Sequence, residues 1–102
     1  MNLLKETIHE MLSHGYLVTD IKYVIVDGMA YQWEDFAAVA DFEYDSGYGS
    51  YEVNPQMTIV MEDGHWFERE EYDGSEWWSY RTYPTPEKPT HKMLKQEMLR
   101  VG

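Results

Sequence analysis

Residues 56–83 read QMTIVMEDGHWFEREEYDGSEWWSYRTY and contain three runs in which apolar and polar residues alternate. Asp63-Gly64 and Asp73-Gly74 separate these runs. An Asp-Gly pair between alternating runs is the strongest short-range signal for a β-hairpin, because Gly takes a positive φ at no steric cost. The stretch therefore predicts three consecutive antiparallel strands over residues 56–62, 65–72 and 75–83.

The same pattern continues toward the N-terminus. Asp27-Gly28 separates a run at 21–26 from a run at 29–33, which predicts a further hairpin. Residues 36–45 also alternate, with apolar residues at even positions and acids at 41, 43 and 45, so we expect a half-buried strand there. The alternative is a helix over 34–40, because the run EDFAAVA holds good helix formers behind two acids suited to a first turn. We expect a loop at 46–50 and a turn at Asn54-Pro55.

A helix is predicted at each end of the chain. Residues 2–14 can begin at the N-cap Asn2 and end before Gly15, with an apolar stripe at Leu4, Ile8, Met11 and Leu12. After prolines at 84, 86 and 89, Thr90 can cap a short helix. Its apolar positions are Leu94, Met98 and Val101. We expect a single α+β domain over residues 1–102, in which an N-terminal and a C-terminal helix flank an antiparallel β-meander of about four to six strands.

The chain is strongly acidic, with a formal net charge of −11 over 102 residues and a pI near 4.5. Thirteen acids and one base lie between Glu34 and Glu76, whereas residues 77–102 carry five bases and two acids. Such a field repels nucleic acids and anionic membranes and attracts basic protein surfaces. The alternative is that the charge serves only solubility. The 16% aromatic content is typical of a folded chain and not of a disordered acidic tail.

Cysteine is absent, which excludes disulfides and thiolate metal sites and fits a reducing compartment. The N-terminal residues lack an apolar run of signal-peptide length, and no run approaches the length of a membrane span. We therefore expect a cytoplasmic location, in the host cell if the protein is encoded by a phage.

Two acidic segments are candidates for binding a partner protein. In the predicted strand, Asp41, Glu43 and Asp45 would hold carboxylates at fixed spacing, which can imitate the phosphates of a nucleic acid. The second segment, 70–78, combines carboxylates with large aromatic rings, and adjacent Trp77 and Trp78 must point to opposite faces of a strand. The candidate binding residues are Asp41, Glu43, Asp45, Glu70, Glu71, Tyr72, Asp73, Glu76, Trp77 and Trp78. The alternative is that the acids form an ordinary solvent-exposed face and the tryptophans belong to the core.

Catalytic and metal-binding motifs are missing from the sequence. The four histidines show no metal-ligand spacing, and there is no nucleophile elbow and no phosphate-binding glycine loop. The acids at 41, 43 and 45 with Glu52 could hold a hard cation, but residues two apart on a strand do not converge on one ion. We expect no enzymatic activity, no cofactor and no metal site.

The runs FEYDSGYG at 42–49 and DGHWFEREEYDGSEWW at 63–78 resemble a pattern in small acidic proteins of phages and prophages. The resemblance covers residues 33–86. It implies a setting in phage infection, where small acidic proteins often inhibit host proteins, including defence nucleases. It implies no settled activity.

These observations favour an acidic accessory protein that binds and inhibits a host protein with a basic surface. A nucleic-acid-binding defence protein could be blocked by charge mimicry, as in anti-CRISPR or anti-restriction proteins. Two alternatives stay open. One is a self-associating assembly module, for example a homodimer, and the other is a binder of a small ligand or a divalent metal.

Overall fold

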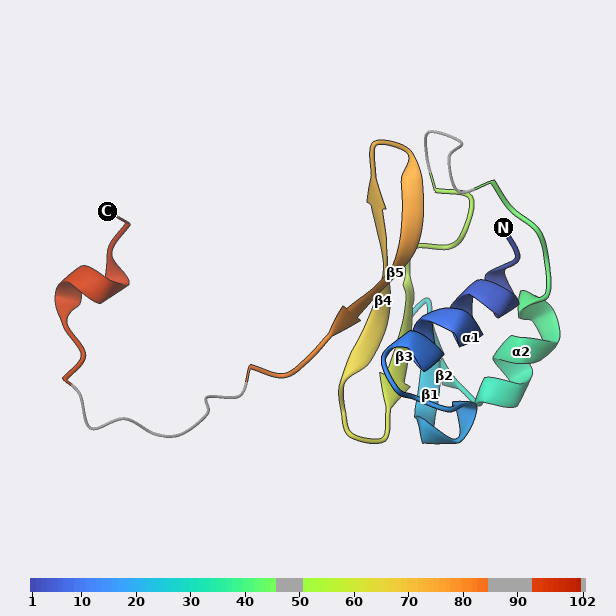
Figure 1. Ribbon diagram of the computed structural model, residues 1–102, viewed down its shortest axis with the longest axis horizontal. Helices are drawn as coiled ribbons and strands as arrows, with labels where there is room; N and C mark the ends of the chain where they lie inside the picture. The colour runs from blue at the N-terminus through green and yellow to red at the C-terminus, as the bar shows by residue number, and fades with distance from the viewer. Residues whose placement is uncertain (46–50, 85–92, 102) are drawn as a thin grey trace.

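A computed structural model describes residues 1–45, 51–84 and 93–101. It confirms the α+β class with five antiparallel strands in the order β2-β1-β3-β4-β5. Figure 1 shows helices α1 and α2 on the same side of this sheet. The elements are α1 (Leu3–Ser13), the 3₁₀ turn η1 (Val18–Asp20), β1 (Ile21–Val26), β2 (Met29–Tyr31), α2 (Trp33–Ala40), β3 (Met57–Met61), β4 (Trp66–Tyr72), β5 (Ser75–Arg81) and the 3₁₀ turn η2 (Gln96–Leu99). None of the described helices is long and apolar enough to cross a membrane.

All three Asp-Gly pairs connect antiparallel strands, as predicted. Asp27-Gly28 and Asp73-Gly74 have positive φ at both residues, which is the two-residue turn that matches the twist of the flanking strands. The connection at Asp63-Gly64 is wider: only Gly64 has positive φ, and the Met61 N–H donates to the His65 carbonyl at 2.9 Å. Between β2 and β3 the chain crosses the sheet through α2, so the meander is interrupted there and β3 pairs with β1.

Replacing Gly28 by alanine is expected to lower the free energy of unfolding by about 1–2 kcal/mol, because a Cβ at φ 82° meets the following carbonyl. No neighbouring atom lies within 4 Å of the added Cβ, so the loss comes from the backbone alone. Urea unfolding measures it. Gly28→Asn is the control and should lose less, because asparagine tolerates the left-handed conformation. Equal losses for both variants would contradict this explanation.

Helix α1 begins as predicted, because the Asn2 side chain accepts a hydrogen bond from the Lys5 N–H at 3.0 Å. Its buried stripe differs from the predicted one and consists of Leu3, Thr7 and Met11. Thr7 can be buried because its hydroxyl donates to the Leu3 carbonyl at 2.7 Å and accepts from Trp78. Apolar residues at 4, 8 and 12 are therefore only half-buried or exposed.

The strand predicted over 36–45 is wrong, and residues Trp33–Ala40 form helix α2. Phe36 and Ala40 are four residues apart and are both buried, while Val39 between them is exposed. Positions 36, 40 and 44 share a face in both a strand and a helix, so the alternation alone could not separate the two structures. Acids at 34 and 35 occupy the first turn, where they favour the helix dipole.

The predicted C-terminal helix is also not observed. Residues 93–101 contain only the short turn η2, and all of them are exposed. The second helix that covers the sheet is α2 instead, in the middle of the chain (Figure 1). The predicted cap Thr90 and the predicted loop at 46–50 lie outside the described residues.

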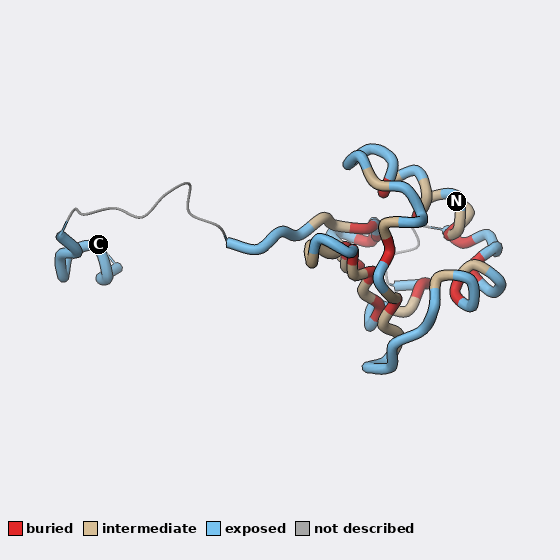
Figure 2. Tube along the Cα trace, turned by 90° about the horizontal axis from the view of Figure 1, so that it is seen from below, coloured by how far each residue is buried: buried red, intermediate tan, exposed pale blue. Residues whose placement is uncertain are grey.

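The two faces of the sheet differ in burial. The covered face lies under the helices, and its central residues Val24, Ile59 and Phe67 follow one another across β1, β3 and β4 with no exposed surface. The burial pattern in Figure 2 agrees, since the buried residues lie between the sheet and the helices. On the opposite face, the open face, no described residue is fully buried. The open face of β1, β3, β4 and β5 includes Tyr23, Ile25, Thr58, Val60, Trp66, Glu68, Glu70, Tyr72, Trp77, Ser79 and Arg81.

Candidate functional site

Adjacent Trp77 and Trp78 on β5 lie on opposite faces of the sheet, as their position in a strand requires. Trp78 is 2% exposed under α1, and its Nε1 donates to the Thr7 hydroxyl at 2.8 Å. Trp77 is 36% exposed on the open face, where its Nε1 donates to Ser79 Oγ at 3.1 Å. Only Trp77 of the pair is therefore available to a partner.

A buried ionic cluster lies under α1, on the covered face of the β4–β5 hairpin. The Arg69 guanidinium donates to Glu76 at 3.1 Å and to the Tyr44 hydroxyl at 3.2 Å, and it lies 3.4 Å from Glu6. It also stacks 4.9 Å from the Trp78 ring. Both Arg69 and Glu76 have fully buried side chains. Glu76 and Trp78 are among the predicted binding residues, but both lie in the core, so that part of the prediction is wrong.

The same cluster attaches the connection between α2 and β3 to the sheet. Glu76 accepts hydrogen bonds from the backbone N–H groups of Glu52 at 2.7 Å and Val53 at 3.1 Å. The Tyr44 hydroxyl donates to Glu6 at 2.5 Å. Residues on both sides of 46–50 are thus held by buried charge, which fixes Tyr51 and Glu52 beside the start of β5.

Tyr44 makes stability depend on pH at the alkaline end. Burial, together with the hydrogen bond to Glu6, raises the pKa of Tyr44 to about 12, although the Arg69 charge acts in the opposite direction. The folded state therefore holds this proton more tightly than the unfolded state, in which tyrosine titrates near 10. Its contribution to stability is complete below pH 10 and is lost as the pH rises from 10 to 12.

We therefore expect the free energy of unfolding to fall by about 2 kcal/mol between pH 10 and 12. Urea unfolding at several pH values measures the slope. In Tyr44→Phe the slope should become shallower, even if the variant is less stable at pH 8. Part of the slope should persist, because burial and the hydrogen bond to Asp63 also raise the pKa of Tyr16. An unchanged slope in Tyr44→Phe would contradict the assignment.

The acids Asp41, Glu43 and Asp45 do not form the strand array that was predicted. Asp41 ends α2 and accepts from the Asn2 side chain at 2.8 Å. Glu43 pairs with Asn2 in an isolated β-bridge and lies 3.4 Å from the N-terminal ammonium group. The Asp45 N–H donates to Glu52 at 2.7 Å. Asp41 and Glu43 are thus exposed, but they serve to attach the N-terminus of α1.

Exposed aromatic rings and carboxylates gather at the turn end of the β4–β5 hairpin. We call this surface the acidic apex. Tyr72 is 76% exposed there, and Glu71 accepts a hydrogen bond from the Gly74 N–H at 2.7 Å, which fixes its carboxylate beside the turn. The acidic apex consists of Tyr51, Glu52, Glu70, Glu71, Tyr72, Asp73 and Trp77.

Electrostatics at Tyr51 show that the acidic apex carries a negative potential. Burial and the carboxylates of Glu71 and Glu76 raise the pKa of the Tyr51 hydroxyl, and Glu70 adds to the effect. The opposing charge of Arg69 is not sufficient to cancel it. Carboxylates of the β4–β5 hairpin therefore act on an exposed ring of the connection after α2.

One base, Arg81, lies on the open face beside the acidic apex. It donates to Glu68 and to Glu70 at 2.7 Å each, and all three side chains are partly exposed. The hydrogen bond from Ser79 is the main cause that lowers the pKa of Glu70, desolvation opposes it, and the Arg81 charge adds to the lowering. Glu70 is therefore charged at neutral pH and paired with Arg81, whereas no base among the described residues forms an ion pair with Glu52, Glu71 or Asp73.

The described residues contain no group of three or more histidine and acidic side chains that could hold a metal ion. What the acidic apex can do is present charge and aromatic surface to another molecule. Sequence reasoning missed Tyr51 and Glu52, because only the buried Arg69–Glu76 pair brings them to the hairpin. A signal for that pair was present, since Arg69 is the single base among thirteen acids. Comparisons of the chain with protein-family models, with curated proteins and with solved structures gave no match.

Proposed function

We propose that the chain is a protein-binding domain whose acidic apex binds a basic surface on another protein. The observation that carries this proposal is that exposed aromatic rings lie beside carboxylates on both sides of one hairpin end, which is fixed by buried charge. Tyr72 and Trp77 lie with Glu70 on the open face, and Tyr51 lies near Glu71 on the helix side. Exposed Tyr and Trp side chains are the usual anchors of protein interfaces. Acids around them speed association with a basic partner and oppose acidic partners.

A protein that binds nucleic acid is the partner that best fits this chemistry. Such a protein presents lysine and arginine side chains that normally neutralise phosphates. Occupation of that surface by the acidic apex would exclude the nucleic acid, so binding would also inhibit. The resemblance to small acidic phage proteins supports a host defence protein as the target.

The experiment starts with the full chain immobilised as bait for a bacterial lysate, followed by affinity measurements with the protein that is captured. We expect the dissociation constant to rise about tenfold or more between 50 and 200 mM salt, because the contact is electrostatic. A salt-independent affinity would contradict binding by charge.

Charge variants locate the contact. Neutralising Glu71 and Asp73 together should weaken binding about tenfold and make the affinity less dependent on salt. The matched control neutralises Glu34 and Asp35, two exposed acids on α2. This double variant changes the formal net charge by the same amount. If both double variants weaken binding equally, the net charge is responsible and the acidic apex is not the site.

Self-association is the competing outcome. Light scattering after size-exclusion chromatography, at several protein concentrations, would then show a dimer, and exposed Trp77 would be shielded from fluorescence quenchers. A monomer with a quenchable tryptophan supports a foreign partner.

A further inference from the structure

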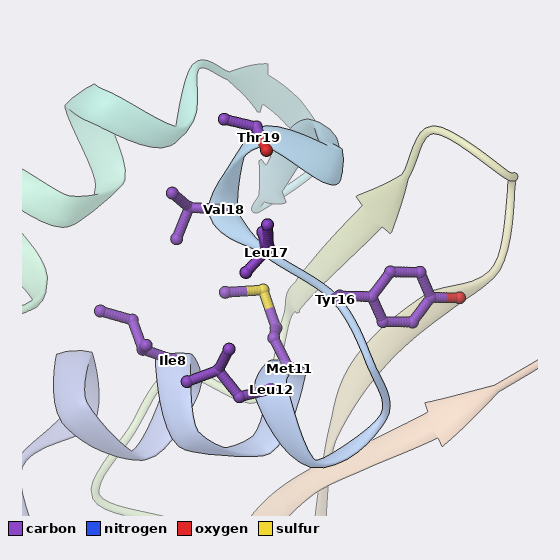
Figure 3. Close-up of a pocket in the computed structure, with 7 residues that line it drawn as sticks. All are labelled: Ile8, Met11, Leu12, Tyr16, Leu17, Val18 and Thr19. Atoms are coloured by element: carbon purple, nitrogen blue, oxygen red, sulfur yellow. The ribbon is translucent and has the colours of Figure 1, made fainter.

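An apolar groove opens beside the C-terminal end of α1, on the helix side of the sheet. It encloses about 310 Å³ between α1 and the segment that follows it. Figure 3 shows Ile8, Leu12, Leu17 and Val18 around this one space. Leu12 is 53% exposed and Leu17 is 59% exposed. The groove exists because α1 buries Leu3, Thr7 and Met11, so the next stripe of the helix is only partly covered: Ile8 packs against the core, whereas Leu12 is exposed.

The C-terminal segment, residues 93–101, carries the complementary apolar surface. Leu94, Met98 and Val101 recur at the spacing of one helix face, and all three are exposed, as are Met93 and Leu99. Five large apolar side chains in nine residues form an unusual exposed stretch for a protein with this charge, and such stretches mark interaction sites.

The chain leaves the sheet next to the groove. Tyr16 lines the groove, and its ring points away from the other lining residues (Figure 3). Its hydroxyl lies 2.6 Å from that of Tyr80 on β5, and β5 ends one residue later. Residues 82–92 separate this point from the C-terminal segment. Eleven residues span at most about 36–40 Å when extended. The segment is therefore long enough to reach its own groove.

Charge favours the same pairing. Asp20 accepts from the Leu17 N–H at 2.8 Å, which places one carboxylate beside the groove. The C-terminal segment carries the bases Lys95 and Arg100 and one acid, Glu97, so it is net basic. Opposite charges at the rim orient an amphipathic helix whose apolar face enters the groove.

We propose that this groove is the docking site of the chain's own C-terminal segment, which binds there as a short amphipathic helix. The docked segment adds a third helix to the layer that covers the sheet. This inference is independent of the acidic apex, which lies at the opposite end of the β4–β5 hairpin.

Paramagnetic relaxation in the full chain tests the proposal, because a single added cysteine is the only site for a spin label in a cysteine-free protein. In spin-labelled Gln96→Cys, which keeps the apolar face of the segment intact, we expect broadening of the NMR methyl signals of Leu12, Leu17 and Val18. The control signal is Val39, an exposed apolar residue on α2 outside this groove, which should stay sharp. Broadening centred on Val39, or no broadening of any of these signals, would overturn the proposal.

A mixed sample separates the chain's own segment from that of a second copy. Isotope-labelled chain without the spin label is mixed with spin-labelled chain at natural isotope abundance, so only intermolecular docking broadens the observed signals. We expect no broadening in the mixture. Equal broadening in both samples would show docking between copies and would overturn the intramolecular assignment.

A groove variant supplies the second check in the same spin-labelled chain. Leu12→Glu places an acid in the groove at an exposed position and should reduce the docked population about tenfold or more. Val39→Glu makes the same change on α2 and should leave the broadening at Leu17 and Val18 unaltered. If Leu12→Glu leaves it unaltered too, the segment does not bind in this groove.

Discussion

Replacing Arg69 by methionine is expected to lower the free energy of unfolding by about 3–5 kcal/mol. The substitution leaves Glu76 as a buried carboxylate without its cation, and it removes the donors to Tyr44 and Glu6. Two backbone N–H groups still donate to Glu76, but they do not neutralise its charge. A buried unpaired charge is among the most destabilising changes a single substitution can make.

Arg81 offers a matched control in the same hairpin. It is also an arginine between two glutamates, with shorter contacts of 2.7 Å to both, but its side chain is 43% exposed. Exposed ion pairs contribute little, so Arg81→Met should lower the free energy of unfolding far less than Arg69→Met does. Urea unfolding of both variants measures the difference. Similar losses of unfolding free energy in the two variants would mean that burial does not determine how strongly the Arg69 cluster stabilises the fold.

The second large effect concerns the aromatic anchors of the acidic apex. Trp77→Ser is expected to weaken binding of the captured protein about 30-fold, which corresponds to about 2 kcal/mol for a central aromatic anchor. Tyr72→Ser should act in the same direction. Tyr72 is 76% exposed, so Tyr72→Ser should change the free energy of unfolding little, whereas Trp77, at 36%, should lose some packing. Circular dichroism and urea unfolding check that both variants are folded under the binding conditions.

Tyr31→Ser is the matched control for the anchors. Tyr31 is also an exposed tyrosine, but it lies on β2 at the other edge of the sheet. Its replacement should leave the affinity unchanged. If Tyr31→Ser weakens binding as much as Trp77→Ser does, the partner contacts the β2 edge and the assignment to the acidic apex is wrong.

The sheet could be predicted from sequence because its signals are local. Each Asp-Gly pair requires a backbone conformation that few residues tolerate, and the flanking runs alternate. Asn2 likewise marks the start of α1 through a hydrogen bond to a residue three positions away. Such features depend on neighbours in the chain, so sequence spacing is sufficient to find them.

The wrong predictions concern residues whose structure depends on contacts with parts of the chain that are distant in sequence. Phe36 and Ala40 lie on one side of the element whether it is a strand or a helix, so only packing against the sheet selects the helix α2. The hairpin pattern predicts Tyr72 and Trp77 of the acidic apex. It does not predict Tyr51, because the residues after Tyr51 are held by hydrogen bonds to Glu76, more than twenty residues away. Glu76 itself was assigned to the surface because sequence gives no indication of which acid will meet Arg69.

The most direct test of the acidic apex is the change in amide NMR signals of the full chain when the captured protein is added. The largest changes should occur at residues 51–52 and 70–77, and they should diminish as salt is raised. Changes centred on α2 or β2, with the β4–β5 hairpin unaffected, would contradict the proposed binding surface.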